Sequence, residues 1–78
     1  MRLLRLPNVL DCRGLKRAQH YADIKQGLCT PPVKLGRASA WPEHEIDELV
    51  RAQIAGADES RRRKLVLRLL VERLTPKV

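Results

Sequence analysis

Apolar and polar positions divide the first part of the chain into short elements separated by glycine and proline. Residues 3–6 are mostly apolar and predict a short edge strand. Pro7 suits the first turn of a helix, because the N–H that proline lacks would be unpaired there. This helix is expected over residues 7–12, and an Arg13-Gly14 turn follows it. A second helix is predicted over residues 15–26, which gives a helix-turn-helix pattern.

The middle of the chain has the pattern of a small β-hairpin. The paired prolines at 31 and 32 exclude helix and predict an extended connector. Residues 33–35 alternate as a strand does, Gly36-Arg37 is a turn signal, and residues 38–41 can return as the second strand. A hairpin in this position is the wing of a winged helix, with Lys34 and Arg37 near its tip.

Two longer helices are predicted after the hairpin. The first begins at Pro42 and ends at Gly56, and its apolar residues recur at three- and four-residue spacing: Ile46, Leu49, Val50 and Ile54. Its four acidic residues are interpreted as helix-end electrostatics and solubility rather than catalysis: Glu43, Glu45, Asp47 and Glu48. The second is expected from Asp58 to Leu74, with Asp58 or Ser60 as its cap and Thr75-Pro76 as its end.

The last helix has a wide apolar arc. One polar stripe is formed by Arg61, Lys64, Arg68 and Glu72. The rest is covered by Leu65, Val66, Leu67, Leu69, Leu70, Val71 and Leu74. This arc is wider than one small domain easily uses. Either the helix closes over the first core, or it packs against another copy. The candidates for self-association are Leu67, Leu70, Val71 and Leu74.

The predicted fold is therefore mainly α with a small β-hairpin wing. A winged helix-turn-helix domain is expected over residues 1–56, and a C-terminal amphipathic helix over residues 57–78. The chain has 78 residues with no Phe, one Trp and one Tyr, so its core must be built from Leu, Val, Ile and Ala. Such a short chain buries only a modest fraction of its surface, and its core is marginal.

The charge is unevenly distributed along the chain. Residues 1–41 carry eight Lys/Arg and two Asp/Glu, residues 42–57 carry one Arg and four acids, and residues 58–78 carry seven Lys/Arg and three acids. The net charge of +7 and its basic–acidic–basic zoning favour a polyanion partner, above all nucleic acid, over a merely solubilising surface. The basic run over residues 61–64 is equally well explained as a phosphate contact or as a solvated helix start.

The side chains best suited to contact nucleic acid lie on the second predicted helix. If residues 15–26 are helical, Tyr21 and Ile24 fall on one side and can dock into a small core. Four side chains can then point outward: Lys16, Arg17, Gln19 and His20. These residue types donate to phosphate oxygens and to base edges, and paired hydrogen bonds would let Arg read guanine and Gln read adenine.

Other functional classes find little support in the sequence. Cys12 and Cys29 have no Cys or His at ligand spacing, so they are interpreted as two small buried hydrophobes rather than a metal site or disulfide. No cofactor is expected. An enzyme is not supported, because no phosphate-binding glycine loop, activated nucleophile or metal cluster is found. No signal peptide or membrane span is expected, and binding of the last helix to a membrane surface is disfavoured. A bacterial, cytoplasmic and nucleoid-associated location is expected.

Several short stretches occur together in a characteristic order. They are Leu6-Pro7-x-Val9-Leu10, the Gly14-Leu15 turn, a basic helix containing Tyr21, Gly27, Pro32-Val33-Lys34-Leu35-Gly36 and Trp41-Pro42-Glu43-His44-Glu45-Ile46. Together they resemble the AlpA family of prophage regulatory proteins, which are small relatives of the MerR-type winged helix and of phage excisionases. The resemblance covers residues 3–56, and the Pro-Val-Lys-Leu-Gly string followed by Trp-Pro is more specific than a helix-turn-helix alone.

The resemblance implies a DNA-binding regulator of a prophage or other mobile element. Members activate integrase or excision genes, or act directly as recombination directionality factors. The implied partners are double-stranded DNA at a promoter or attachment site and, further, an integrase. The residues placed at recognition-helix contacts are Lys16, Arg17, Gln19 and His20, with Tyr21 of the same helix as a further candidate. Those mapped to the wing are Lys34, Arg37 and Ser39.

Three residues depart from the family pattern. His20 and Asp23 stand where many members have apolar residues, so they are expected either to face outward and alter base preference or to pair with each other. Cys29 replaces a common aromatic, and looser packing is expected under the connector.

A protein-binding adaptor or anti-repressor on the same scaffold is the alternative function. It predicts no salt-dependent DNA binding, whereas a DNA-binding protein predicts a steep salt dependence.

Overall fold

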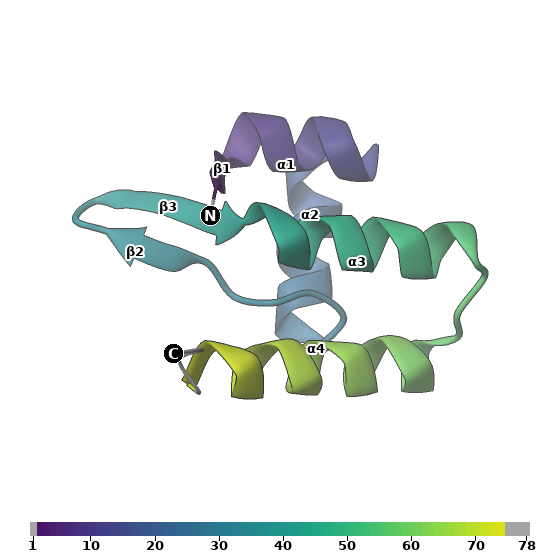
Figure 1. Ribbon diagram of the computed structural model, residues 1–78. Coiled ribbons are helices and arrows are strands. Elements are labelled where there is room, and N and C mark those ends of the chain that lie inside the picture. Colours follow the sequence, from purple (N-terminus) through teal and green to yellow (C-terminus); the bar gives the residue numbers. More distant parts are fainter. Residues whose placement is uncertain (1, 75–78) are drawn as a thin grey trace.

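The structure is a computed structural model that describes residues 2–74, and its elements follow the order that the sequence predicts. They are β1 (Leu3–Arg5), α1 (Leu6–Arg13), α2 (Arg17–Lys25), β2 (Val33–Leu35), β3 (Ala38–Pro42), α3 (Glu43–Ile54) and α4 (Glu59–Leu74). In Figure 1, α1, α3 and α4 run across the view one above another, α2 crosses behind them, and the β2–β3 hairpin projects to one side. The predicted winged helix with a C-terminal helix is confirmed. The predicted helix end at Thr75-Pro76 lies outside the described residues.

A three-stranded antiparallel sheet forms the base of the wing, in the order β1-β3-β2. Leu4 pairs with Trp41 in the β1–β3 ladder, and Val33 pairs with Ala40 in the β2–β3 ladder. Successive side chains of a strand point to opposite faces, and β1 accordingly buries Leu4 while Leu3 and Arg5 stay exposed. The N-terminal strand therefore anchors the hairpin to the helical body.

Helix α1 is one residue longer at its C-terminal end than the sequence predicts. Pro7 lies in its first turn, and Gly14 closes it in the left-handed conformation at φ 64°. That φ favours glycine, because a side chain would crowd the backbone there. Arg13, expected in the turn, is instead the last helical residue and is buried. Its side chain can therefore reach between α1 and α2.

Helix α4 closes over the core of the helix-turn-helix. The core brings together residues from nearly every element, with Val9, Trp41, Ile46, Leu49, Val66 and Leu69 among them. Leu65 and Leu70 pack against this cluster, whereas Leu67 and Leu74 are 64% and 84% exposed. The wide apolar arc thus divides into a face that completes the chain's own core and a strip that stays at the surface.

Ion pairs tie α4 to α3. Arg73 donates from Nε to Oε2 of Glu45 at 2.7 Å and from Nη2 to Oε1 at 2.6 Å, and Glu45 is fully buried. Arg68 pairs with Glu48 on the same helices. Glu45 lies in the first turn of α3, as predicted, but it is not solvated, because an arginine 28 residues away in the sequence pairs with it inside the fold.

Candidate nucleic-acid interface

Basic and polar side chains are exposed on α2. Lys16 is the N-cap of this helix, in extended conformation and without a side-chain capping hydrogen bond in the described chain. Lys16, Arg17, Gln19 and Lys25 are all exposed. The Arg17 guanidinium stands over the Tyr21 ring, with its Cζ 5.7 Å from the ring centroid. The first turns of α2 therefore present the donors that the sequence predicted for them, with the exception of His20.

Tyr21 was expected to dock into the core beside Ile24, but it does not. Its side chain remains at the surface, 38% exposed, and its ring contacts the edge of His20 at a centroid distance of 5.4 Å. Ile24 is half-buried and packs against the core as expected. The reason for the difference is that His20 occupies the inward position beside Ile24.

The expectation that His20 points outward is wrong. Its side chain is fully buried, and its ring packs in a T-shape on Trp41 at a centroid distance of 4.9 Å. Nδ1 lies 3.0 Å from Nη1 of Arg13, which donates to it, while Nε2 is buried without a hydrogen-bond partner among residues 2–74. Burial lowers the pKa of His20 and Arg13 lowers it further, against an opposing effect of Asp23. The imidazole is therefore held neutral.

Asp23 lies beneath α2 and joins it to α1. Its Oδ2 accepts a hydrogen bond from Arg13 Nη2 at 2.9 Å, and its Oδ1 accepts one from Gln19 Nε2 at 2.8 Å. The Arg13 and Asp23 side chains are only 1% and 6% exposed. His20 and Asp23 thus neither face outward nor pair with each other, because Arg13 binds both. Sequence analysis missed Arg13, although two polar residues on the same inward side of α2 as Ile24 signal a buried partner.

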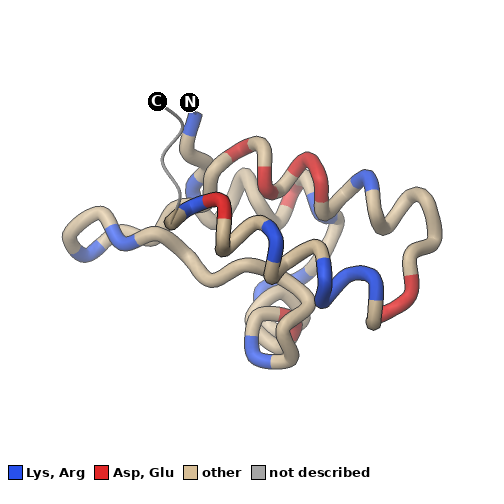
Figure 2. The backbone as a smooth tube through the Cα atoms, turned by 60° about the horizontal axis from the view of Figure 1, so that its bottom comes forward, with Lys and Arg blue, Asp and Glu red and all other residues tan. Residues whose placement is uncertain are grey.

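The wing carries its predicted residues on the hairpin. Lys34 and Ser39 are opposite each other in the β2–β3 ladder, and Lys34 Nζ donates to Ser39 Oγ at 2.9 Å. Arg37 is exposed in the two-residue turn between the strands. Figure 2 shows this loop projecting from the body of the protein with basic positions on it. The wing therefore offers cationic side chains apart from those of α2.

The start of α4 lies beside the end of α2. Arg63 Nε donates to the backbone oxygen of Gln26 at 3.1 Å, and Arg63 also pairs with Glu59 at 3.4 Å. Figure 2 shows the longest basic run of the backbone at this start of α4. The basic start of α4 thus lies beside α2, whereas the later turns of α4 pair with the acidic residues of α3 through Arg68 and Arg73.

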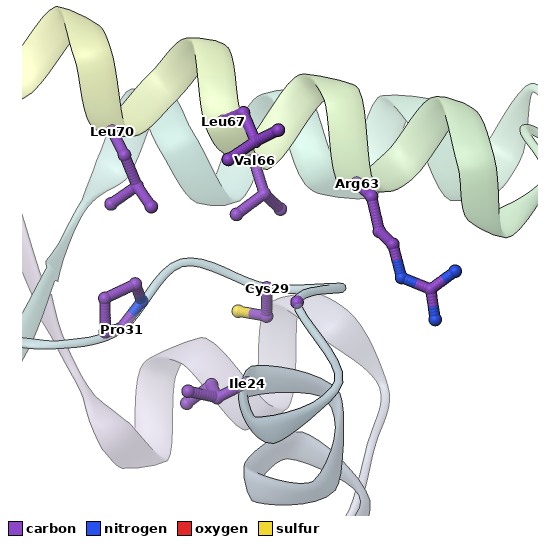
Figure 3. Close-up of a pocket in the computed structure, with 8 residues that line it drawn as sticks. Ile24, Cys29, Pro31, Arg63, Val66, Leu67 and Leu70 are labelled. Atoms are coloured by element: carbon purple, nitrogen blue, oxygen red, sulfur yellow. The ribbon is translucent and has the colours of Figure 1, made fainter.

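A shallow apolar groove of about 250 Å³ lies between α4 and the connector that follows α2. In Figure 3, Val66 and Leu70 of α4 face Cys29 and Pro31 of the connector across it.

Cys29 is buried, and burial raises the pKa of its thiol to about 11. Cys12 is exposed on α1, so the expectation of two buried cysteines is correct only for Cys29. The buried residues of α1 are Val9 and Arg13, and Cys12 lies outside this buried side of the helix.

No group of three or more His, Cys, Asp and Glu side chains in residues 2–74 could hold a metal ion. None of the helices in this range combines the length and the apolar character needed to cross a membrane.

Comparison with known proteins identifies the family. No curated protein and no solved structure gives a significant match. The sequence profile of the family described as Prophage CP4-57 regulatory protein (AlpA) matches residues 2–54. This span runs from β1 to the end of α3 and leaves α4 outside it. The resemblance found in the sequence is thereby confirmed, and the chain belongs to the AlpA family of prophage regulatory proteins.

Proposed function

We propose that this member of a prophage regulatory family is a sequence-specific DNA-binding regulator of a prophage or integrative element. The observation that carries the proposal is the exposure of basic side chains on α2 and on the wing, the two elements with which winged helices contact DNA. Double-stranded DNA at a promoter or attachment site is the proposed partner. Phosphate contacts by these side chains would position the protein, and base contacts would specify the site.

In this proposal α2 enters the major groove. Lys16 and Arg17 contact phosphates or guanine edges, Gln19 reads a base, and Tyr21 adds a contact at the surface. Arg37, at the turn of the wing, reaches the adjacent minor groove or its phosphates. His20 is not among the proposed contacts, because its side chain is fully buried. His20 instead supports α2 from beneath.

The wing makes a second proposed contact region with Lys34, Arg37 and Ser39. The hydrogen bond from Lys34 to Ser39 stiffens the hairpin across its two strands. Arg37, which lies beyond that pair in the turn, is the wing residue with the greatest reach toward DNA. Removing Arg37 is therefore expected to weaken binding more than removing Ser39.

One module of this size buries only about 600–1,000 Å² on DNA, which is little for a specific regulator. We therefore propose that several copies act together on repeated sites through the exposed strip of α4. Leu67, Val71 and Leu74 are 64%, 61% and 84% exposed and follow one another at helical spacing. Leu70 is half-buried against the chain's own core, so it contributes less than the sequence indicated.

The proposed DNA binding would serve either excision of the element or transcription of its genes. As an excisionase or recombination directionality factor, the protein would act with an integrase on attachment-site DNA. As an activator, it would raise transcription of integrase or excision genes. An excision assay with purified integrase and no transcription separates the two roles, because only the first supports excision there.

The DNA-contact proposal is tested with Arg17→Ala and Arg37→Ala. Both variants are expected to bind attachment-site or promoter DNA more weakly than the parent. Arg51→Ala, which removes the same charge from an exposed position on α3, is the matched control and is expected to bind as the parent does. If Arg17→Ala and Arg37→Ala bind specific and random DNA as tightly as Arg51→Ala, the assigned contacts are wrong. A parent with no salt-dependent DNA binding favours the protein-binding adaptor.

Self-association is tested by placing aspartate at Leu67 and Leu74. The mass of the free protein and of its complex with repeated sites is measured by sedimentation velocity. Ile54→Asp, at an apolar position on α3 that is 81% exposed, controls for the added charge. Complexes of lower stoichiometry are expected for the α4 variant only. An unchanged mass, with the fold intact, would exclude the strip as the contact between copies.

A further inference from the structure

The carboxylate of Asp23 joins donors from two helices. Arg13 Nη2 of α1 donates to Oδ2 at 2.9 Å, and Gln19 Nε2 of α2 donates to Oδ1 at 2.8 Å. A carboxylate paired with arginine only accepts hydrogen bonds, whereas an amide has one donating and one accepting end. Gln19 must therefore turn its nitrogen toward Asp23, and its oxygen Oε1 lies at the opposite end of the amide.

The position of Asp23 is itself fixed. Its partner Arg13 has a side chain 1% exposed, and its second amino group donates to Nδ1 of His20 at 3.0 Å. His20 in turn packs on Trp41 in the core. The chain of contacts from Trp41 to Gln19 therefore holds one exposed amide in a set orientation before any DNA is present.

We propose that the Arg13–Asp23 ion pair is a positioning device that fixes the polarity of the Gln19 amide, so that α2 reads an adenine through Gln19. The proposal rests on the DNA-binding function proposed above. Adenine presents a 6-amino donor beside the N7 acceptor in the major groove, whereas guanine presents two acceptors, O6 and N7. Oε1 can accept from the 6-amino group, and the second hydrogen on Nε2 remains to donate to N7.

The same contacts explain why guanine is rejected. To offer two donors to guanine, the Gln19 amide would have to turn over and place Oε1 against Oδ1 of Asp23. Two acceptors would then face each other without a proton between them, and a polar group left unpaired in this way carries a cost. An unrestrained glutamine could turn either way at little cost, so the ion pair is the source of the discrimination.

The experiment is selection from a randomised DNA library with the full chain, followed by affinity measurements on the selected site. The parent is expected to select an A·T pair at one position that Gln19→Ala no longer selects. Replacing that adenine with a purine lacking the 6-amino group should weaken parent binding about tenfold to a hundredfold. Gln19→Ala should be indifferent to the same replacement. These measurements need no variant of the buried pair.

Asp23→Asn tests the positioning role itself. Arg13 still requires an acceptor, so the introduced amide turns its oxygen to Arg13 and its nitrogen to Gln19. The Gln19 amide must then reverse and present its two N–H donors outward. Selection is expected to change from A·T to G·C with the purine on the same strand, while Asp23→Asn combined with Gln19→Ala selects as Gln19→Ala does. A purely structural role of Asp23 would weaken binding to all sites equally.

The outcomes separate this inference from the proposed function. A parent that binds no DNA overturns both. A parent that selects a site overturns the inference alone if Gln19→Ala relaxes no position, if it relaxes a G·C pair, or if the 6-amino group proves dispensable. A folded Asp23→Asn that keeps the A·T preference also overturns it. Circular dichroism and urea unfolding establish that each variant is folded.

Discussion

Loss of the Asp23 carboxylate is expected to remove a large part of the stability of this fold. The Arg13 and Asp23 side chains are 1% and 6% exposed and joined at 2.9 Å. The Arg13 guanidinium contacts Asp23 Oδ2 and His20 Nδ1. Asp23→Ala removes the first of these two contacts and leaves the guanidinium buried beside His20. Breaking a buried ion pair on one side costs about 3–5 kcal/mol. A domain of this length has only about 4–12 kcal/mol in total, at roughly 0.05–0.15 kcal/mol per residue.

Urea unfolding followed by circular dichroism measures this loss as a change in the free energy of unfolding. Asp47→Ala removes an exposed carboxylate from α3 and serves as the control, with an expected change within about 0.5 kcal/mol. Arg13→Met combined with Asp23→Leu removes both charges and should recover most of the stability lost by Asp23→Ala, because no unpaired charge remains.

Two results would refute this reasoning. If Asp23→Ala costs no more than Asp47→Ala, the buried pair does not hold α1 against α2. If the double variant is as unstable as Asp23→Ala, the cost arises from lost packing and not from the unpaired guanidinium.

The remaining predictions concern the environments of His20, Lys16 and the two cysteines. The folded-state pKa of His20 lies below its usual value of 6.5, so the unfolded chain binds a proton more readily. The neutral, buried imidazole therefore stabilises the fold above about pH 6.5, and this stabilisation is lost as the pH falls below that value. His20→Asn should flatten this acid-side loss in urea titrations at several pH values, whereas a replacement at the exposed His44 should not, and equal slopes for both would contradict the assignment. Lys16→Ser supplies the side-chain cap that α2 lacks, and it should raise the free energy of unfolding by about 0.5–2 kcal/mol while weakening DNA binding. An unchanged or lower melting temperature would contradict this prediction. Cys12 should react with a thiol reagent in the native protein, whereas Cys29, buried and with its pKa raised to about 11, should react only on unfolding, so equal native reaction rates would disagree with the structure.

Local signals were sufficient to predict the elements of the fold. Pro7 and Gly14 delimit α1, and the paired prolines before β2 separate the helix-turn-helix from the wing. These residues act through their own backbone restrictions, which do not depend on distant contacts. The two possible positions of α4 could not be separated in this way, because an apolar arc shows that a surface is buried but not which surface covers it.

The errors fall on polar residues whose partners lie in other elements. Periodicity assigns a polar side chain to the solvent side, so it placed His20 outward and Glu45 in a solvated helix end. In the structure Arg13 and Arg73 supply partners for these buried side chains. Such pairs follow from tertiary packing and leave no local pattern. The contacts proposed for Lys16, Arg17 and Arg37 lie on the predicted elements, and their role in DNA binding stays a prediction.

The most direct test of the account is the salt dependence of DNA binding by the parent, Arg17→Ala, Arg37→Ala and Arg51→Ala. Each phosphate neutralised by a basic side chain contributes about −0.9 to the slope of log K against log salt concentration. The account predicts a steep slope for the parent and for Arg51→Ala, and a slope shallower by about one unit for Arg37→Ala, with a similar reduction for Arg17→Ala where it contacts phosphate. A parent slope near zero, or one slope shared by all four proteins, would contradict the claim that α2 and the wing form the DNA interface.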